Sequence, residues 1–129
     1  MTNKINMKKL FSFLTLLLLT SCYQQERNCT DFKTGKFQFE QEIEGKKEIS
    51  IFERTDSIQI ETFRGKIDTS TVRWINDCEF VLNKLHPKGM SDKKTIHMKV
   101  LTTTADSYTF EYSYVGESNK MKGTVKKIN

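Results

Sequence analysis

Hydrophobic and polar residues alternate along most of the chain after residue 34, and this pattern predicts β-strands. In the stretch 36–43, Phe37, Phe39 and Ile43 point to one side, and the charged or amide side chains between them point to the other. Alternation with a period of two residues is typical of a strand that has one face on a core and the other in water.

The same pattern continues to the end of the chain and gives about eight strands joined by short turns. We expect them at residues 36–43, 47–54, 57–63, 67–75, 78–85, 95–103, 107–115 and from 121 onward. In the third of these, Ile58 and Ile60 are in phase and Phe63 is out of phase, which indicates a bulge or the end of the strand. No segment has the helical period over enough residues to compete. The pattern therefore predicts an all-β antiparallel meander, closed or nearly closed into an up-and-down barrel, with a strongly curved sheet or a two-sheet sandwich as the alternative.

The first residues have a different character from the rest. A basic stretch with Lys4, Lys8 and Lys9 precedes an apolar run over 10–19, which is too short for a membrane span and typical of a secretory signal. The run ends at Leu19-Thr20-Ser21-Cys22, which resembles the bacterial lipobox, in which a lipidated cysteine becomes the mature N-terminus. The alternative is an ordinary signal peptide with an incidental cysteine.

This resemblance sets the expected domain organisation. We expect a lipoprotein signal peptide at 1–21, a lipidated N-terminus and tether at 22–33, and a single β domain at 34–129. Removal of residues 1–21 leaves 108 residues, enough for one modest core. It also takes the Lys and Arg count from 21 to 18 against 16 acids, so the net charge falls from +5 to +2. The expected partner is thus a membrane, reached through lipid on Cys22, and not a nucleic acid; the expected location is the cell envelope, at the outer membrane.

Two cysteines remain once Cys22 is assigned to lipid. Cys29 and Cys78 form an even pair in an oxidising compartment, which favours a disulfide. On the chain-entropy argument such a bridge would stabilise the fold by about 4 kcal/mol. Two free buried thiols, or a metal site shared with His86 or His97, are the alternatives. Neither histidine has ligand spacing to a cysteine, so no metal is expected.

An aromatic face provides the candidate binding site. Tyr108, Phe110, Tyr112 and Tyr114 alternate on one side of a single strand. With Trp74 and Phe80 they could line a ligand pocket inside a barrel, because aromatic walls with a few hydroxyls suit small apolar ligands. The alternative is that these side chains fill the core.

The sequence contains no comparable motif for catalysis. His97 alternates with apolar neighbours and so faces solvent, and His86 lies in the connection before Pro87. The acidic residues alternate with lysines along the polar faces, which is typical of a solubilising surface and not of two carboxyls facing one cleft. We therefore expect no enzyme and no cofactor.

The motifs together resemble a known family. The likeness lies in the lipobox, Cys29-x-x-Phe32-x-Thr34-Gly35-x-Phe37, Phe52-Glu53-Arg54 and Trp74-Ile75-Asn76-Asp77-Cys78-Glu79-Phe80-x-Leu82. The chain looks like small exported lipoproteins of Bacteroidota, a family of uncharacterised function whose short members sometimes carry a DNA topoisomerase label. That label does not suit so short an exported chain. Gly35-x-Phe37 also gives a loose likeness to lipocalins, although the tryptophan usual in their first strand is absent.

We accordingly expect a membrane-anchored envelope lipoprotein that acts as a non-catalytic binding or interaction module, possible ligands being small and apolar. The alternative is a structural or accessory lipoprotein with a filled core and no ligand.

Overall fold

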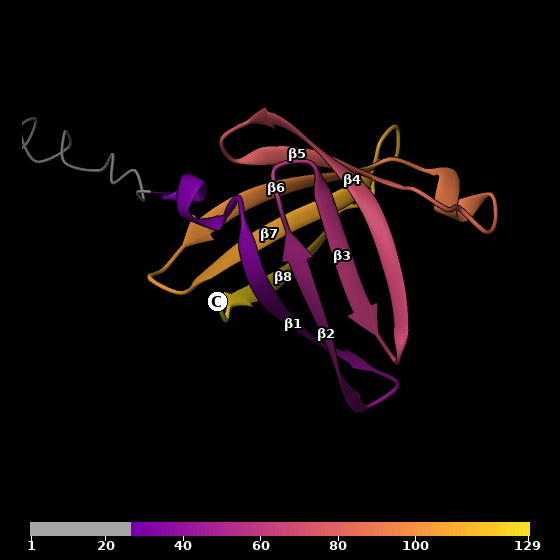
Figure 1. Ribbon diagram of the computed structural model, residues 1–129, viewed down its shortest axis with the longest axis horizontal. Coiled ribbons are helices and arrows are strands. Elements are labelled where there is room, and N and C mark those ends of the chain that lie inside the picture. Colours follow the sequence, from indigo (N-terminus) through magenta and orange to yellow (C-terminus); the bar gives the residue numbers. More distant parts are fainter. Residues whose placement is uncertain (1–26) are drawn as a thin grey trace, which may run out of the picture.

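Eight antiparallel strands form a closed barrel in which each strand pairs with its neighbours in sequence order (Figure 1). The structure, a computed structural model, describes residues 27–129. Two short 3-10 helices, η2 (Cys29–Phe32) and η3 (Ser91–Lys93), accompany the strands. The strands are β1 (Gly35–Ile43), β2 (Lys46–Arg54), β3 (Ile58–Phe63), β4 (Lys66–Asn76), β5 (Glu79–Lys84), β6 (Ile96–Thr103), β7 (Ser107–Tyr114) and β8 (Met121–Lys127). The predicted all-β meander and its closure into a barrel are confirmed.

The barrel closes where the first strand meets the last. Phe37, Gln38 and Phe39 of β1 pair with Lys127, Lys126 and Val125 of β8. Lys36 also exchanges backbone hydrogen bonds with Ile128 and Asn129, so this part of the two strand edges is not free to pair with another chain.

Two of the hairpins turn through two residues with positive φ. Glu44-Gly45 joins β1 to β2, with φ of 52° and 76°, and Arg64-Gly65 joins β3 to β4, with φ of 50° and 74°. Positive φ at both central positions is the type I′ arrangement, whose twist matches that of paired strands. Glycine at the second position lowers the steric cost of each turn.

The hairpin between β4 and β5 differs from the sequence expectation by one residue. The pairing shifts between Trp74 and Asn76, so the strand carries a bulge, and Asp77-Cys78 forms the turn. The side-chain oxygen of Asn76 accepts a 2.9 Å hydrogen bond from the Cys78 N–H, which fixes the turn.

β3 presents its polar side chains to the barrel interior. Gln59 pairs with Arg54 of β2 on the inner face and is only 8% exposed, whereas Ile58 and Ile60 lie outside and are 37% and 41% exposed. Phe63 is the last residue of β3 and lies on the same face of the strand as Gln59. The residue that is out of phase with the isoleucines is therefore on the inner face, at the end of the strand. The inversion occurs because Arg54 is buried and Gln59 is the neighbour that accepts a hydrogen bond from it.

One end of the barrel is covered by the N-terminal segment, and we call it the closed end. Phe32 of η2 is buried there, with its ring 5.4 Å from that of Tyr108. Asn28 donates a hydrogen bond to Thr103 at the end of β6, and Lys127 at the end of β8 donates to the Asp31 carbonyl. The other end, which carries the β1–β2, β3–β4 and β7–β8 turns and the β5–β6 loop, is the open end.

The disulfide attaches η2 to the closed end. The Sγ atoms of Cys29 and Cys78 are 2.05 Å apart, which confirms the predicted bridge. Cys29 is buried in the main core cluster, and Cys78 packs against it. The β4–β5 turn is therefore covalently attached to the segment that covers the barrel end.

Candidate binding site

A cavity of about 160 Å³ lies inside the barrel and is lined by residues of both core clusters. Its polar lining residues are Arg54, Gln59, Glu61 and two tyrosines, and the rest of its wall is aromatic or aliphatic. The aromatic and aliphatic residues are Phe39, Phe52, Leu82, Ile96, Met98, Phe110 and Val125. Period-two alternation explains the arrangement, since each strand contributes its inward-facing positions. A mainly apolar wall with a few polar groups is the usual composition of a small-molecule site.

Arg54 is the most deeply buried charged residue of the cavity wall, at 2% exposed. Its Nε donates to the Lys33 carbonyl at 3.0 Å, and its Nη1 donates to Gln59 Oε1 at 3.0 Å. Its Nη2 donates to the Phe32 carbonyl at 2.6 Å and to the Tyr108 hydroxyl at 3.2 Å. All four acceptors are neutral.

Aromatic rings surround the same guanidinium. Its carbon lies 4.7 Å from the ring centroids of Phe37 and Phe80 and 5.5 Å from that of Phe52. A cation over an aromatic face is attracted by the ring quadrupole, and the attraction is stronger away from water. The rings therefore supply part of the stabilisation that a counter-ion would otherwise give.

Glu61 also lies on the cavity wall. It is the next inward-facing residue of β3 after Gln59, in the direction of the open end. It pairs with Phe52 on one side and with Asp68 on the other. Burial raises the pKa of the Glu61 carboxyl, the negative charge of Asp68 raises it further, and Lys84 opposes both in part. Burial disfavours the charged form because charge is poorly solvated there.

Lys84 neutralises the acids near the open end. Its Nζ lies 3.2 Å from Asp92 Oδ1 and 3.7 Å from Asp68 Oδ2. Asp92 belongs to η3, so this contact also attaches the β5–β6 loop to β5. These pairs are partly exposed and each contributes about 1 kcal/mol or less.

The structure brings together only part of the predicted pocket lining. Tyr108, Phe110 and Tyr112 line the cavity, and burial, followed by the nearby Tyr114, raises the pKa of Tyr112. The other three predicted lining residues, Trp74, Phe80 and Tyr114, are not among the cavity walls.

Each of these three has another position. Phe80 is fully buried in a second core cluster, where its ring centroid is 4.5 Å from that of Trp74. Tyr114 lies at the end of β7 beneath Lys94, whose Nζ is 5.2 Å from its ring centroid. Sequence reasoning placed all four alternating aromatics together because it did not fix where along the strand the interior is filled.

Sequence reasoning missed Arg54, Gln59 and Glu61. All three are polar, and the alternation rule assigns polar side chains to the outside. The available signal was β3 itself, where Phe63 is in phase with Gln59 and Glu61 and out of phase with the isoleucines.

The other predicted residues that the structure describes do not line the cavity. Cys22 lies outside the described residues. His97 is on the outer face, with Nε2 3.9 Å from Glu79 Oε2, and His86 is exposed. Within residues 27–129 no group of three or more His, Cys, Asp or Glu side chains has the arrangement of a metal site. In the same residues no helix is both long and apolar enough to cross a bilayer.

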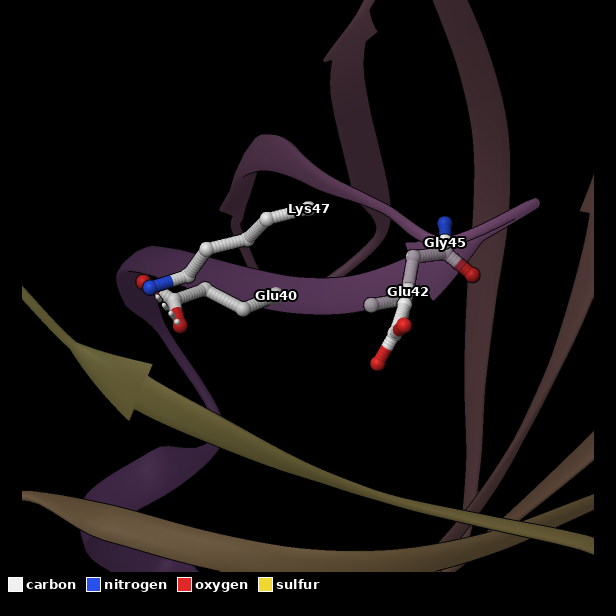
Figure 2. Close-up of a pocket in the computed structure, with 5 residues that line it drawn as sticks. Glu40, Glu42, Gly45 and Lys47 are labelled. Atoms are coloured by element: carbon white, nitrogen blue, oxygen red, sulfur yellow. Dashed lines mark ion pairs between the residues drawn. The ribbon is translucent and has the colours of Figure 1, made fainter.

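A wider hollow of about 460 Å³ lies on the surface beside the β1–β2 turn, but it is not enclosed. Figure 2 shows the side chains of Glu40 and Lys47 pointing toward each other across the two strands, while Glu42 points away from them. The Lys47 Nζ is 3.1 Å from Glu40 Oε2, and both side chains are exposed. This pair is a solvated surface contact.

Comparison of the chain with protein-family models, with curated proteins and with solved structures finds no match in any of the three. The resemblance to small Bacteroidota lipoproteins therefore stays a prediction.

Proposed function

We propose that this protein is a membrane-anchored envelope lipoprotein whose barrel is a non-catalytic module that binds a small, mainly apolar molecule. The interior cavity carries the proposal, because it combines an apolar wall with buried polar groups at one end. A barrel that served only as a stable displayed domain would have no need of polar groups beside unfilled space, since these cost stability.

The size of the cavity limits the ligand. Its volume of about 160 Å³ is below the usual 300–1,000 Å³ of drug-sized sites. It is close to the ~150 Å³ of an engineered apolar cavity that binds benzene. The proposed ligand is thus of about one ring in size.

Fluorobenzene, followed by fluorine NMR, tests the binding of such a molecule. The whole chain carrying Cys22→Ser is expected to bind it at one site. Met98→Trp, which adds bulk to the cavity wall, is expected to abolish binding. His97→Trp places the same side chain on the outer face of the same strand and is the matched control.

The small volume also favours the second candidate, a structural or accessory lipoprotein without a ligand. The two functions differ in this experiment. Absence of fluorobenzene binding, or binding that Met98→Trp leaves unchanged, would favour the structural function and contradict the proposed site.

The lack of catalytic function is part of the proposal. Within residues 27–129 neither histidine lies on the cavity wall, and the carboxyl group there is that of Glu61 alone. A single carboxyl without a neighbouring nucleophile or second acid does not make up the pairs that hydrolases use.

The membrane anchor is proposed from the sequence 10–22 and has its own test. Cys22→Ser is expected to release the protein from membranes and to prevent incorporation of a labelled fatty acid. Ser21→Ala keeps a small residue before the cysteine and is the control. Membrane retention of the Cys22→Ser chain would contradict the lipobox interpretation.

A further inference from the structure

Arg54 is a buried cation without an anionic partner in the described part of the chain. Its side chain is 2% exposed, and the four groups that accept its hydrogen bonds are two backbone carbonyls, an amide oxygen and a phenol oxygen. None of the ion pairs found within residues 27–129 includes it. A buried charge is normally paired, because desolvation without compensation is costly.

The groups around Arg54 also have more donors than acceptors. A guanidinium has five N–H groups, and four are used. The Gln59 oxygen accepts from Arg54, so its amide hydrogens remain, and the Tyr108 hydroxyl likewise accepts and retains its own hydrogen. Within residues 27–129 none of these hydrogens is donated to a protein acceptor. Tyr108 is 1% and Gln59 8% exposed, whereas the fully buried side-chain atom that lacks any partner in this range is Trp74 Nε1.

All three residues line the same cavity, so their unused donors and the positive charge lie beside the unfilled space. The group that complements them is a small anion with several acceptor oxygens. Because the rest of the lining is mainly apolar, the anion would be the head of a mainly apolar molecule. Carboxylate fits this description, since its two oxygens accept several hydrogen bonds in a plane.

We propose that the cavity binds small monocarboxylic acids of about one ring in size, with the carboxylate against Arg54, Gln59 and Tyr108 and the apolar body toward Leu82, Met98 and Phe110. This inference rests on the proposed binding function and specifies its ligand class. Glu61, nearer the open end, lies on the wall beside the apolar body.

An amine is the competing ligand class, because Glu61 could pair with it. Three probes of the same size distinguish the classes: 4-fluorobenzoate, 4-fluorobenzyl alcohol and 4-fluorobenzylamine. The whole Cys22→Ser chain is expected to bind the benzoate at least about tenfold more tightly than the alcohol, as one charge-assisted hydrogen bond suffices to give. The amine is expected to bind no better than the alcohol.

Gln59→Glu tests the position of the carboxylate. This substitution preserves the shape of the side chain and the oxygen that accepts from Arg54, but it gives the guanidinium an anionic partner. The affinity for 4-fluorobenzoate is expected to fall at least about tenfold, while that for the neutral alcohol is unchanged. Gln38→Glu makes the same chemical change outside the cavity, where Gln38 pairs with Ile51, and is the matched control.

Tyr108→Phe provides a second variant in case Gln59→Glu does not fold, as judged by circular dichroism. It removes one hydroxyl from the cavity wall. The affinity for 4-fluorobenzoate is expected to fall several-fold, and that for the alcohol is expected to change little.

The outcomes separate the two proposals. If the alcohol binds as tightly as the benzoate, and neither variant changes the ratio, the carboxylate inference is wrong and the binding function stands. Preferential binding of the amine would also overturn it. If neither fluorobenzene nor any of the three probes binds, the proposed function itself fails.

Discussion

The carbonyl oxygen of Phe32 accepts a 2.6 Å hydrogen bond from Nη2 of Arg54, 22 residues further along the chain. This bond, with the neighbouring one to the Lys33 carbonyl, attaches the segment after η2 to the end of β2. The same arginine also donates to the cavity-lining Gln59 and Tyr108. One side chain therefore both holds the covering segment in place and forms the polar end of the cavity.

Replacement of Arg54 by methionine is expected to lower the free energy of unfolding by about 3 kcal/mol, since it leaves the Phe32 and Lys33 carbonyls unpaired beneath η2. Urea unfolding followed by circular dichroism measures the change. Arg73→Met, at an exposed position of β4, is the control and is expected to stay within about 0.5 kcal/mol of the parent. Equal effects of the two substitutions would contradict the structural role of Arg54.

Loss of the disulfide is expected to destabilise the barrel by about 4 kcal/mol, because the bridge between Cys29 and Cys78 spans 49 residues and restricts the unfolded chain. A Cys29→Ser, Cys78→Ser chain, unfolded in urea, gives the value. Reductant should lower the free energy of unfolding of the parent protein to the same extent and leave that of the double variant unchanged. Native protein whose cysteines both react with a thiol reagent without reductant would contradict the bridge.

Gly123→Ala is expected to destabilise the protein by about 1–3 kcal/mol through overpacking. A Cβ at Gly123 would lie 2.8 Å from ring atoms of both Phe39 and Phe110, which meet edge to face with their centroids 5.5 Å apart. Thermal unfolding measures the effect. Gly89→Ala is the matched control, because a Cβ there meets no atom within 4 Å. Since both rings line the cavity, Gly123→Ala is also expected to weaken fluorobenzene binding.

The raised pKa of Glu61 makes stability depend on pH in a definite direction. A carboxyl whose pKa is higher in the folded than in the unfolded state binds its proton more tightly when folded. The contribution of Glu61 to the free energy of unfolding is therefore most favourable at a pH below the unfolded pKa. It is lost as the pH rises through the folded pKa. Glu61→Gln is expected to stabilise the protein at pH 7 and to change little near pH 3.

Urea unfolding at both pH values tests this expectation, with Glu53→Gln on the exposed face of β2 as the control. A Glu61→Gln chain that is less stable than the parent at pH 7 would show that the attraction of Lys84 outweighs burial.

The sequence was sufficient for the barrel because its strands keep a simple alternation, as Phe37 and Phe39 of β1 show, and because short turns force neighbouring strands to pair. The disulfide followed from the number of cysteines once Cys22 was assigned elsewhere. Both predictions depend on local pattern or on counting.

The polar end of the cavity could not be predicted in this way. Arg54 is buried because two backbone carbonyls, one amide oxygen and several rings come together around it, and these belong to segments distant in sequence. A local sequence pattern does not predict contacts between segments that are distant in sequence. The expected lining residues Trp74 and Phe80 were placed on the correct face, but they pack against each other in the second core cluster and do not line the cavity.

The N-terminal segment covers one end of the barrel, so the two ends differ. This difference matters when the protein is coupled to a surface or to a tag. Arg27 and Asn28 hydrogen-bond to β6 at the closed end, through the Val100 carbonyl and the Thr103 hydroxyl. A sensor chip, resin or fluorescent tag coupled upstream of residue 27 should therefore hold the barrel by its covered end and leave the opposite rim accessible. Coupling through the Glu44-Gly45 turn, at that rim, would instead crowd the opening, so the site of attachment should decide whether immobilised protein still takes up small molecules.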